Sequence, residues 1–230
     1  MFRKEEITTI FMDVDDTLLD FKECAREDVR NCCLKNGITY SDDLFDFFLN
    51  RNVILWKRIE DGLLTVDELH RTRWAGIFRD FGIEADGPAF ENDFIAGLRE
   101  TSVPVSGAHE AMEYLHSRYK VYVVSNASNL QQTTRLRKAG LMQYVDGVFG
   151  SLDIGFIKPS REYFDYCFSQ LAGTTPQQTV IIGDSLNADI SGGIAYGLHT
   201  IWFNMRNVEP SGSTFPDYTI HSLSELTSLL

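Results

Sequence analysis

Short apolar segments that end in polar residues divide this chain, and they constrain its fold more than any other feature. Each is rich in β-branched and aromatic residues, and the four clearest are residues 7–14, 120–126, 179–184 and 199–204. Nearly continuous apolar runs of this length are typical of strands that are buried on both faces, as in a parallel sheet. Weaker strand candidates lie at residues 145–150 and 217–220.

Helical patterns separate the later strands. Apolar side chains recur at helical spacing within residues 106–118, 129–139, 161–171 and 186–196, and glycine follows the second and the fourth of these ranges. Strand and helix therefore alternate from about residue 104 onward. This alternation predicts an α/β core with a doubly wound, mostly parallel, Rossmann-like sheet.

The first strand is an exception, because a long stretch without strand patterns follows it. Helices are expected there at residues 42–57, 65–81 and 91–99, the second of them opened by a capping-box pattern. A single crossover between two strands does not need such a length. We therefore expect a helical domain, residues 21–99, inserted into a core domain that consists of residues 1–20 and 100–230.

The charge balance excludes some classes of partner. The chain of 230 residues has 33 acidic and 21 basic residues, a net charge of −12, and so does not favour a nucleic-acid polymer as partner. No segment resembles a signal peptide or a membrane span. The four cysteines lack paired spacing, which indicates reduced thiols. We expect a cytoplasmic protein without a membrane partner, as a monomer or a weak homo-oligomer.

Polar residues collect where the predicted strands end. The candidates are Asp13, Asp15 and Thr17 after the first strand, Ser125 and Asn126 after the second, Lys158 in a later loop, and Asp184 and Asp189 near the fourth. Ligands of open α/β sheets bind beyond the carboxyl ends of the strands, near the point where the strand order reverses. Acids clustered there repel one another unless a cation compensates for their charge.

These residue types suit phosphoryl chemistry. Asp13 and Asp15 are two positions apart, so an extended backbone directs both side chains to one side. Carboxylate oxygens are preferred ligands of Mg²⁺. One carboxylate can attack phosphorus, while a second acid protonates the leaving oxygen and then activates water. Ser125 can donate to a phosphoryl oxygen, and Lys158 can neutralise its charge.

Taken together, four motifs in this order resemble those of the haloacid dehalogenase (HAD) superfamily of phosphohydrolases. Residues 13–17 match DxDxT, Ser125 matches the Ser/Thr of the second motif, Lys158 precedes proline as in the third, and residues 183–189 match GDxxxD. The resemblance covers nearly the whole chain. An acid at position 15 distinguishes phosphoryl transfer from dehalogenation, which does not need it.

The resemblance implies roles for the acidic residues. Asp13 would be the nucleophile and a Mg²⁺ ligand, and Asp184 would bind the metal directly. Asp15 would be the general acid/base and would give its backbone carbonyl to the metal. Thr17 would support this loop.

The resemblance also implies how the phosphoryl group is held. Ser125 and the backbone amide of Asn126 would bind it, and Lys158 would bridge it to Asp13. Asp189 would act through water or hold Lys158.

The helical insert resembles the C1 cap of this superfamily, which covers the site and carries much of the substrate choice. Residues 16–21, 56–58, 125–132 and 200–204 resemble the bacterial 5′-nucleotidase branch, which acts on pyrimidine and non-standard nucleoside monophosphates. Ala127 and Ser160 depart from the residues usual in that branch. The resemblance therefore implies a Mg²⁺-dependent phosphomonoester hydrolase that forms an aspartyl phosphate, with a small phosphate ester, a nucleoside 5′-monophosphate, as substrate.

Two alternatives stay open at this point. A sugar-phosphate phosphatase or phosphomutase could use the same scaffold, although Thr17 stands where hexose mutases usually have glycine. A non-catalytic phospho-acceptor module, such as a receiver domain, also uses acids, a lysine and Mg²⁺. Receivers are much shorter, however, and carry their acceptor on a middle strand.

Within the insert, we expect the aromatic residues to form a core of their own. The basic residues of its helices, Lys57, Arg58, Arg71 and Arg73, are expected to be solvated.

Overall fold

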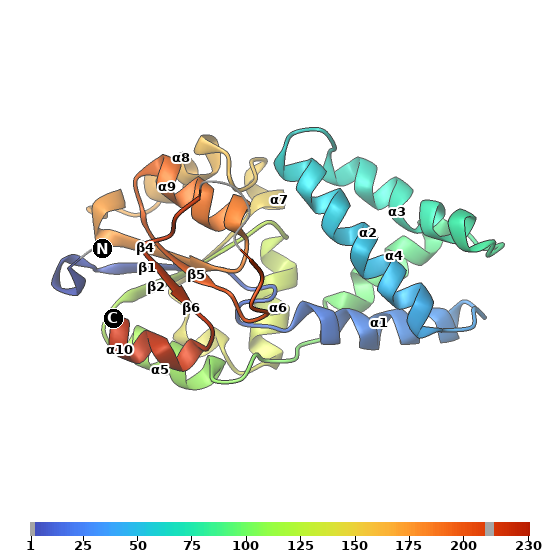
Figure 1. Cartoon of the computed structure of the whole chain (residues 1–230), viewed down its shortest axis with the longest axis horizontal. Coiled ribbons are helices and arrows are strands. Elements are labelled where there is room, and N and C mark those ends of the chain that lie inside the picture. The colour runs from blue at the N-terminus through green and yellow to red at the C-terminus, as the bar shows by residue number, and fades with distance from the viewer. Residues whose placement is uncertain (1–2, 210–213) are drawn as a thin grey trace. The chain divides into compact units, whose positions relative to one another are not determined.

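The computed structural model describes residues 3–209 and 214–230, and the chain forms two compact units (Figure 1). We call Met1–Asp20 with Ser102–Leu230 the core unit, and Phe21–Thr101 the helical unit. The chain thus leaves the core unit after its first strand and returns to it before the second.

The core unit is built on a sheet in which the six described strands are all parallel. They are β1 (Thr9–Met12), β2 (Lys120–Ser125), β3 (Gly147–Gly150), β4 (Thr179–Gly183), β5 (His199–Phe203) and β6 (Tyr218–Ile220). Their order is β3-β2-β1-β4-β5-β6, so the first strand is central, and Ile10 pairs with Val121 of β2 and Val180 of β4. The parallel α/β fold predicted from the sequence is confirmed.

Both faces of this sheet are buried, because helices cover each of them (Figure 1). Ile10 and Met12 of β1 pack in the same apolar cluster as side chains of helices on one face. Phe11 packs in a second cluster with side chains on the other face. Alternate residues of a strand point to opposite faces, which explains why β1 is continuously apolar.

The helices of the core unit follow the predicted alternation. They are α5 (Ala108–His116), α6 (Asn129–Lys138), α7 (Ser151–Ile154), α8 (Arg161–Ser169), α9 (Gly192–Tyr196) and α10 (Leu226–Leu229). Short 3₁₀ turns occupy Lys4–Glu6, Met142–Tyr144, Pro176–Gln178 and Leu223–Glu225. The helix expected at residues 186–196 begins instead as a π-helical segment, Leu186–Ser191, before α9.

The helical unit contains α1 (Phe21–Lys35), α2 (Asp42–Glu60), α3 (Val66–Phe81) and α4 (Gly87–Leu98). Helix α3 begins with the predicted capping box, in which Thr65 and Glu68 satisfy each other's backbone N–H groups. The aromatic core is confirmed: Trp74 is fully buried and stacks on Phe48 with 5.0 Å between ring centroids. The pattern of the sequence did not single out α1.

One basic residue of the helical unit contradicts the sequence prediction. Arg73 is buried, not solvated, and its guanidinium donates to Glu91 at 2.5 and 3.1 Å and to Asn52 at 2.7 Å. It also lies over the ring of Phe94, at 4.9 Å from the centroid. A buried charge needs such partners, because the loss of water is otherwise too costly.

A second buried charged group of the helical unit is Asp28 of α1. Its Oδ1 accepts a weak hydrogen bond from the Cys32 thiol at 3.6 Å, and its Oδ2 has no hydrogen-bond partner among the described residues. Loss of hydration raises the pKa of Asp28 to about 7.

No helix in residues 3–209 or 214–230 has the length and apolar character needed to cross a membrane. The four cysteines are free thiols and are all buried.

Candidate active site

The candidate site lies where the strand order reverses. Successive strands step to one side from β1 to β3, and then β4 starts on the other side of β1. Asp13 follows β1 and Asp184 follows β4. The two strands remain hydrogen-bonded at this point, because the Asp13 N–H donates to the Ile182 carbonyl at 2.9 Å. Two acids are thus placed side by side at the carboxyl edge of the sheet, where ligands of such folds bind.

Lys158 joins three elements of the core unit. Its buried Nζ donates to Asp13 Oδ1 at 2.9 Å, to Asp189 Oδ1 at 2.6 Å and to the Val124 carbonyl at 2.8 Å. These contacts use all three ammonium hydrogens. Burial alone would lower the pKa of Lys158, but the charges of Asp13 and Asp189 outweigh it and raise that pKa.

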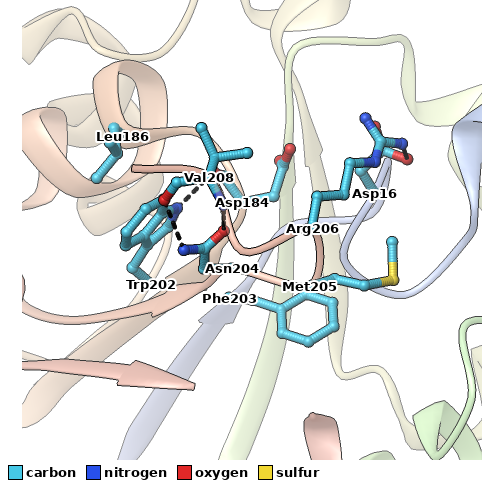
Figure 2. A pocket seen from close by; sticks show the side chains of 9 residues that line it. All are labelled: Asp16, Asp184, Leu186, Trp202, Phe203, Asn204, Met205, Arg206 and Val208. Carbon is cyan, nitrogen blue, oxygen red and sulfur yellow. Dashed lines mark hydrogen bonds and ion pairs between the residues drawn. The ribbon is translucent and has the colours of Figure 1, made fainter. Parts of the chain in front are cut away.

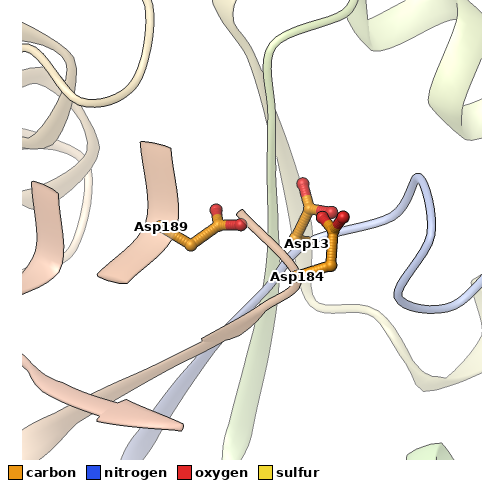
Figure 3. A group of neighbouring side chains, drawn as sticks. All are labelled: Asp13, Asp184 and Asp189. Atoms are coloured by element: carbon orange, nitrogen blue, oxygen red, sulfur yellow. The ribbon is translucent and has the colours of Figure 1, made fainter. Parts of the chain in front are cut away.

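Three carboxylates gather around this lysine. Asp13, Asp184 and Asp189 each offer an oxygen, and these atoms lie within 4.8 Å of one another. Figure 3 shows Asp13 and Asp184 close together, with Asp189 directed toward them. Loss of hydration raises the pKa of Asp13, while Lys158 opposes that shift and Asp189 adds to it. Burial, and then the charge of Asp13, also raise the pKa of Asp184.

This donor set fits a hard divalent cation such as Mg²⁺. Carboxylate oxygens are its usual protein ligands, and burial, with a further contribution from the neighbouring acids, raises the pKa of Asp13 and of Asp184, a shift that a bound cation would oppose. The members are not equivalent. Both oxygens of Asp189 already accept hydrogen bonds, Oδ1 from Lys158 and Oδ2 from the Ser185 N–H at 3.1 Å. Asp13 and Asp184 are therefore better placed than Asp189 to bind a metal ion.

Asn126 fixes the backbone around the lysine. Its side-chain amide donates to the Lys158 carbonyl at 3.0 Å and accepts from the Lys158 N–H at 2.8 Å. The sequence prediction concerned the backbone amide of Asn126. The structure adds that its side chain clamps the loop that carries Lys158.

Ser125 and Asp15 share one neighbour, Gln132, whose role in the site was not predicted from the sequence. Gln132 Nε2 donates to Ser125 Oγ and to Asp15 Oδ2, both at 2.8 Å. Arg135 completes the group, because its Nη1 donates to Asp15 Oδ1 at 2.6 Å. Both residues lie on α6, directly after the strand that ends at Ser125.

The chain turns sharply after β1. Asp16 has the left-handed φ of 59°, which Asp tolerates better than most residues, and its side chain pairs with Arg206 at 2.8 Å. Thr17 is buried and donates its N–H to the Val14 carbonyl at 3.2 Å. Its hydroxyl has no hydrogen-bond partner among the described residues. Among the described residues, the hydrogen bond of Thr17 to this loop is therefore made by its backbone N–H.

A hollow of about 180 Å³ lies beside Asp184 (Figure 2). Residues at and after the end of β5 form most of its wall, including Trp202 and Asn204. Trp202 Nε1 donates to the Asp184 carbonyl at 2.8 Å, and the Asn204 amide holds the Val208 backbone in two hydrogen bonds. The hollow therefore has an ordered wall next to the acidic cluster.

Four of the predicted residues contact or adjoin one another, whereas Asp15 contacts a different part of the core unit. Asp13, Lys158, Asp184 and Asp189 form one contiguous group. Asp15 has side-chain partners of its own on α6. Gln132 and Arg135 are the additions, and their sequence signal is weak: polar residues at i and i+3 on a helix that follows a strand end.

The comparisons with known proteins agree with this geometry. The sequence matches the haloacid dehalogenase-like hydrolase family over residues 7–197. It is 35% identical to HAD-hydrolase YfnB of Bacillus subtilis, over 96% of this chain and 94% of that protein. A crystal structure of YfnB bound to magnesium aligns with a TM-score of 0.93, covering 97% of this chain and 98% of that one.

Two further relatives carry names that state a substrate class. Pyrimidine 5′-nucleotidase PynA of Streptococcus pneumoniae is 34% identical over 96% of this chain and 94% of its own length. Pyrimidine 5′-nucleotidase YjjG of Escherichia coli is 29% identical over 96% of both chains. With the parallel fold and the acid–lysine group at the reversal of strand order, these matches show that the chain belongs to the haloacid dehalogenase-like hydrolases.

Proposed function

We propose that this protein is a Mg²⁺-dependent phosphomonoesterase that acts on nucleoside 5′-monophosphates through a phosphorylated Asp13. The observation that carries the proposal is the buried chain of contacts from Asp13 through Lys158 to Asp189, with Asp184 adjacent. The names of PynA and YjjG support the choice of substrate class.

In the first step, an oxygen of Asp13 attacks phosphorus and forms an acyl phosphate while the bond to the ester oxygen breaks. Asp15 gives its proton to that departing oxygen, so the nucleoside leaves as a neutral alcohol. Lys158, which holds Asp13 Oδ1, fixes the direction of the nucleophile and neutralises charge on the phosphoryl group. Ser125 donates its hydroxyl hydrogen to a phosphoryl oxygen.

In the second step, Asp15 removes a proton from water, and the water oxygen attacks the same phosphorus. The bond between phosphorus and Asp13 breaks, which restores the Asp13 carboxylate and releases inorganic phosphate. A Mg²⁺ ion held by Asp13 and Asp184 would neutralise phosphoryl charge in both steps. Asp189 holds Lys158 throughout, at 2.6 Å.

We assign the helical unit, as part of the same proposal, to the substrate-selecting cap of this family. Its aromatic side chains are mostly committed to its own core, as Trp74 and Phe48 are. Selection of the nucleoside therefore falls to its exposed or half-buried residues.

A phosphate-release screen tests the proposal. Purified protein with Mg²⁺ is offered pyrimidine and purine nucleoside 5′-monophosphates and sugar phosphates, and kcat/KM is measured for each. The expected result is a preference for nucleotides, with activity lost in EDTA and in Asp13→Asn. Turnover of no phosphomonoester, or full activity of Asp13→Asn, would refute it. A higher kcat/KM on sugar phosphates would favour the sugar-phosphate alternative.

A further inference from the structure

A ring of hydrogen bonds joins Asp15 to helix α6. Arg135 Nη1 donates to Asp15 Oδ1 at 2.6 Å, and Gln132 Nε2 donates to Asp15 Oδ2 at 2.8 Å. The same Arg135 nitrogen donates to Gln132 Oε1 at 3.2 Å, which closes the ring. Both carboxylate oxygens of Asp15 thus accept hydrogen bonds, which restrict its side chain to one orientation.

Donor chemistry fixes how Gln132 is oriented in this ring. A guanidinium only donates and a carboxylate only accepts, so the amide oxygen must face Arg135 and the amide nitrogen must face Asp15. The second hydrogen of that nitrogen goes to Ser125 Oγ at 2.8 Å. One nitrogen atom therefore bridges the proposed acid/base and the proposed phosphoryl-binding hydroxyl.

The burial of these two helix residues has no explanation in packing alone. Arg135 and Gln132 are both fully buried, on a helix whose Leu136 belongs to the apolar core. A buried guanidinium loses several kcal/mol of hydration, and an apolar side chain of similar volume often fills such a place without loss of stability. An arginine at position 135 is accounted for by its partner, the Asp15 carboxylate.

We infer that Arg135 and Gln132 are positioning residues for Asp15, and that they couple its direction to that of Ser125. The inference rests on the proposed function, in which Asp15 passes a proton to the ester oxygen. Proton transfer needs the carboxyl group within hydrogen-bond reach of that oxygen. Groups held by surrounding side chains keep such a geometry better than free ones.

The test uses two phosphate esters that differ in their need for a proton. In an alkyl ester, such as a nucleoside 5′-monophosphate, the departing alkoxide is a poor leaving group unless its oxygen is protonated. In p-nitrophenyl phosphate the leaving group is a stabilised phenolate, which departs with little need for protonation. In Arg135→Met and Gln132→Met, which preserve volume, we expect kcat/KM for the alkyl ester to fall about 100-fold. For p-nitrophenyl phosphate we expect a loss below about threefold.

Arg137→Met is the matched control, because Arg137 is exposed on the same helix. It should leave kcat/KM for both esters unchanged. Circular dichroism and the urea midpoint establish that each variant is folded. If Arg135→Met does not fold, Gln132→Met carries the same comparison.

A double-mutant cycle with Asp15→Asn tests whether the two residues act through Asp15. In that background, adding Arg135→Met or Gln132→Met should change the rate by less than about twofold. Equal losses on both esters, or a full further loss in Asp15→Asn, would overturn the inference. If the unsubstituted protein hydrolyses neither ester with Mg²⁺, the proposed function itself fails, and the inference with it.

Discussion

At the scale of single residues, Lys158 is the cation that keeps two buried carboxylates together, with Nζ contacts of 2.9 Å to Asp13 and 2.6 Å to Asp189. Lys158→Met should therefore lower the free energy of unfolding by about 3 kcal/mol, because it leaves buried charges without a partner. Phosphatase activity should fall below detection. Urea unfolding without Mg²⁺ measures the first effect.

Lys120→Met is the control for this variant, since Lys120 makes an exposed ion pair with Asp146 at 2.8 Å. Exposed pairs contribute little to stability, because water already solvates both charges. Equal destabilisation by the two substitutions would contradict the role given to Lys158.

Asp28 makes the stability of the protein depend on pH. Its pKa is raised to about 7 in the folded state and is close to 3.9 when unfolded, so the folded state holds the extra proton between these values. Stability from this group is fully present below about pH 4 and is lost as the pH rises through about 7. Asp28→Asn removes that loss, and its stability relative to the native protein should rise by about 4 kcal/mol from pH 4 to pH 8.

Urea unfolding across this pH range measures the effect. The amide introduced by Asp28→Asn also leaves an N–H group unsatisfied, which shifts the whole difference curve but does not change its slope. Asp46→Asn, at an exposed position of α2, should show no such slope. A flat difference curve for Asp28→Asn would mean that Asp28 is ionised throughout.

Part of the site could be predicted from the sequence, because some of its residues lie directly at strand ends. Asp13 and Asp184 directly follow β1 and β4, and Ser125 is the last residue of β2. Arg135 and Arg73 were not recognised, because a helical arginine is ordinarily solvated. The carboxylate partners explain the burial of these arginines: Asp15 for Arg135, and Glu91 for Arg73. Both partners are distant in sequence from the arginine that they bind.

At the scale of secondary-structure elements, α4 packs closely on two neighbours through glycines near its ends. A Cβ atom at Gly87 would collide with the backbone of Ala75 in α3, and one at Gly97 with the Asp28 carboxylate of α1. Gly87→Ala and Gly97→Ala should each destabilise the protein by about 2 kcal/mol, since overpacking forces such helices apart. Thermal and urea unfolding measure both.

Gly76→Ala is the matched control within the same unit. The atoms nearest to a Cβ there belong to the ends of two flexible side chains, Arg51 at 3.1 Å and Arg79 at 3.9 Å. Alanine is better than glycine in a helix by about 1 kcal/mol, so this variant should be neutral or more stable. Similar losses at all three glycines would contradict the close packing of α4.

Elements with a strong local sequence signal were predicted well, and those without one were not. β1 and α3 were recognised from a continuous apolar run and from a capping box, respectively. Helix α1 lies within the helical insert that was expected, but its bounds were not predicted, because much of its buried face consists of small or weakly apolar residues such as Cys24, Ala25 and Cys32. The π-helical start of the helix, Leu186–Ser191, was not predicted, because apolar spacing does not distinguish it from an α-helix.

At the scale of the whole molecule, a net charge of −12 has to be reconciled with an anionic phosphate ester as the proposed substrate. A bound divalent cation reverses the local sign of the potential where the acids converge. Mg²⁺ binding to the folded state should therefore stabilise it. We expect millimolar MgCl₂ to raise the Tm by about 5 °C, from the binding free energy and the usual entropy of unfolding.

Sodium chloride at matched ionic strength is the control for screening, and should raise the Tm by less. Asp184→Asn, which removes one member of the acidic cluster, should lose the response to Mg²⁺. Differential scanning calorimetry gives both values. Equal shifts with the two salts would argue against a metal site in this cluster.

The position of β1 also sets an order of events during synthesis. This central strand is made first, yet its two neighbours begin only at Lys120 and Thr179. All residues of the helical unit leave the ribosome in the interval. An apolar segment thus stays without its first pairing partner until Lys120 is made and without its second until Thr179, and Asp13 cannot meet Asp184 before β4 has emerged. Slow translation beyond Thr101 would lengthen the time in which β1 is open to aggregation or to chaperones.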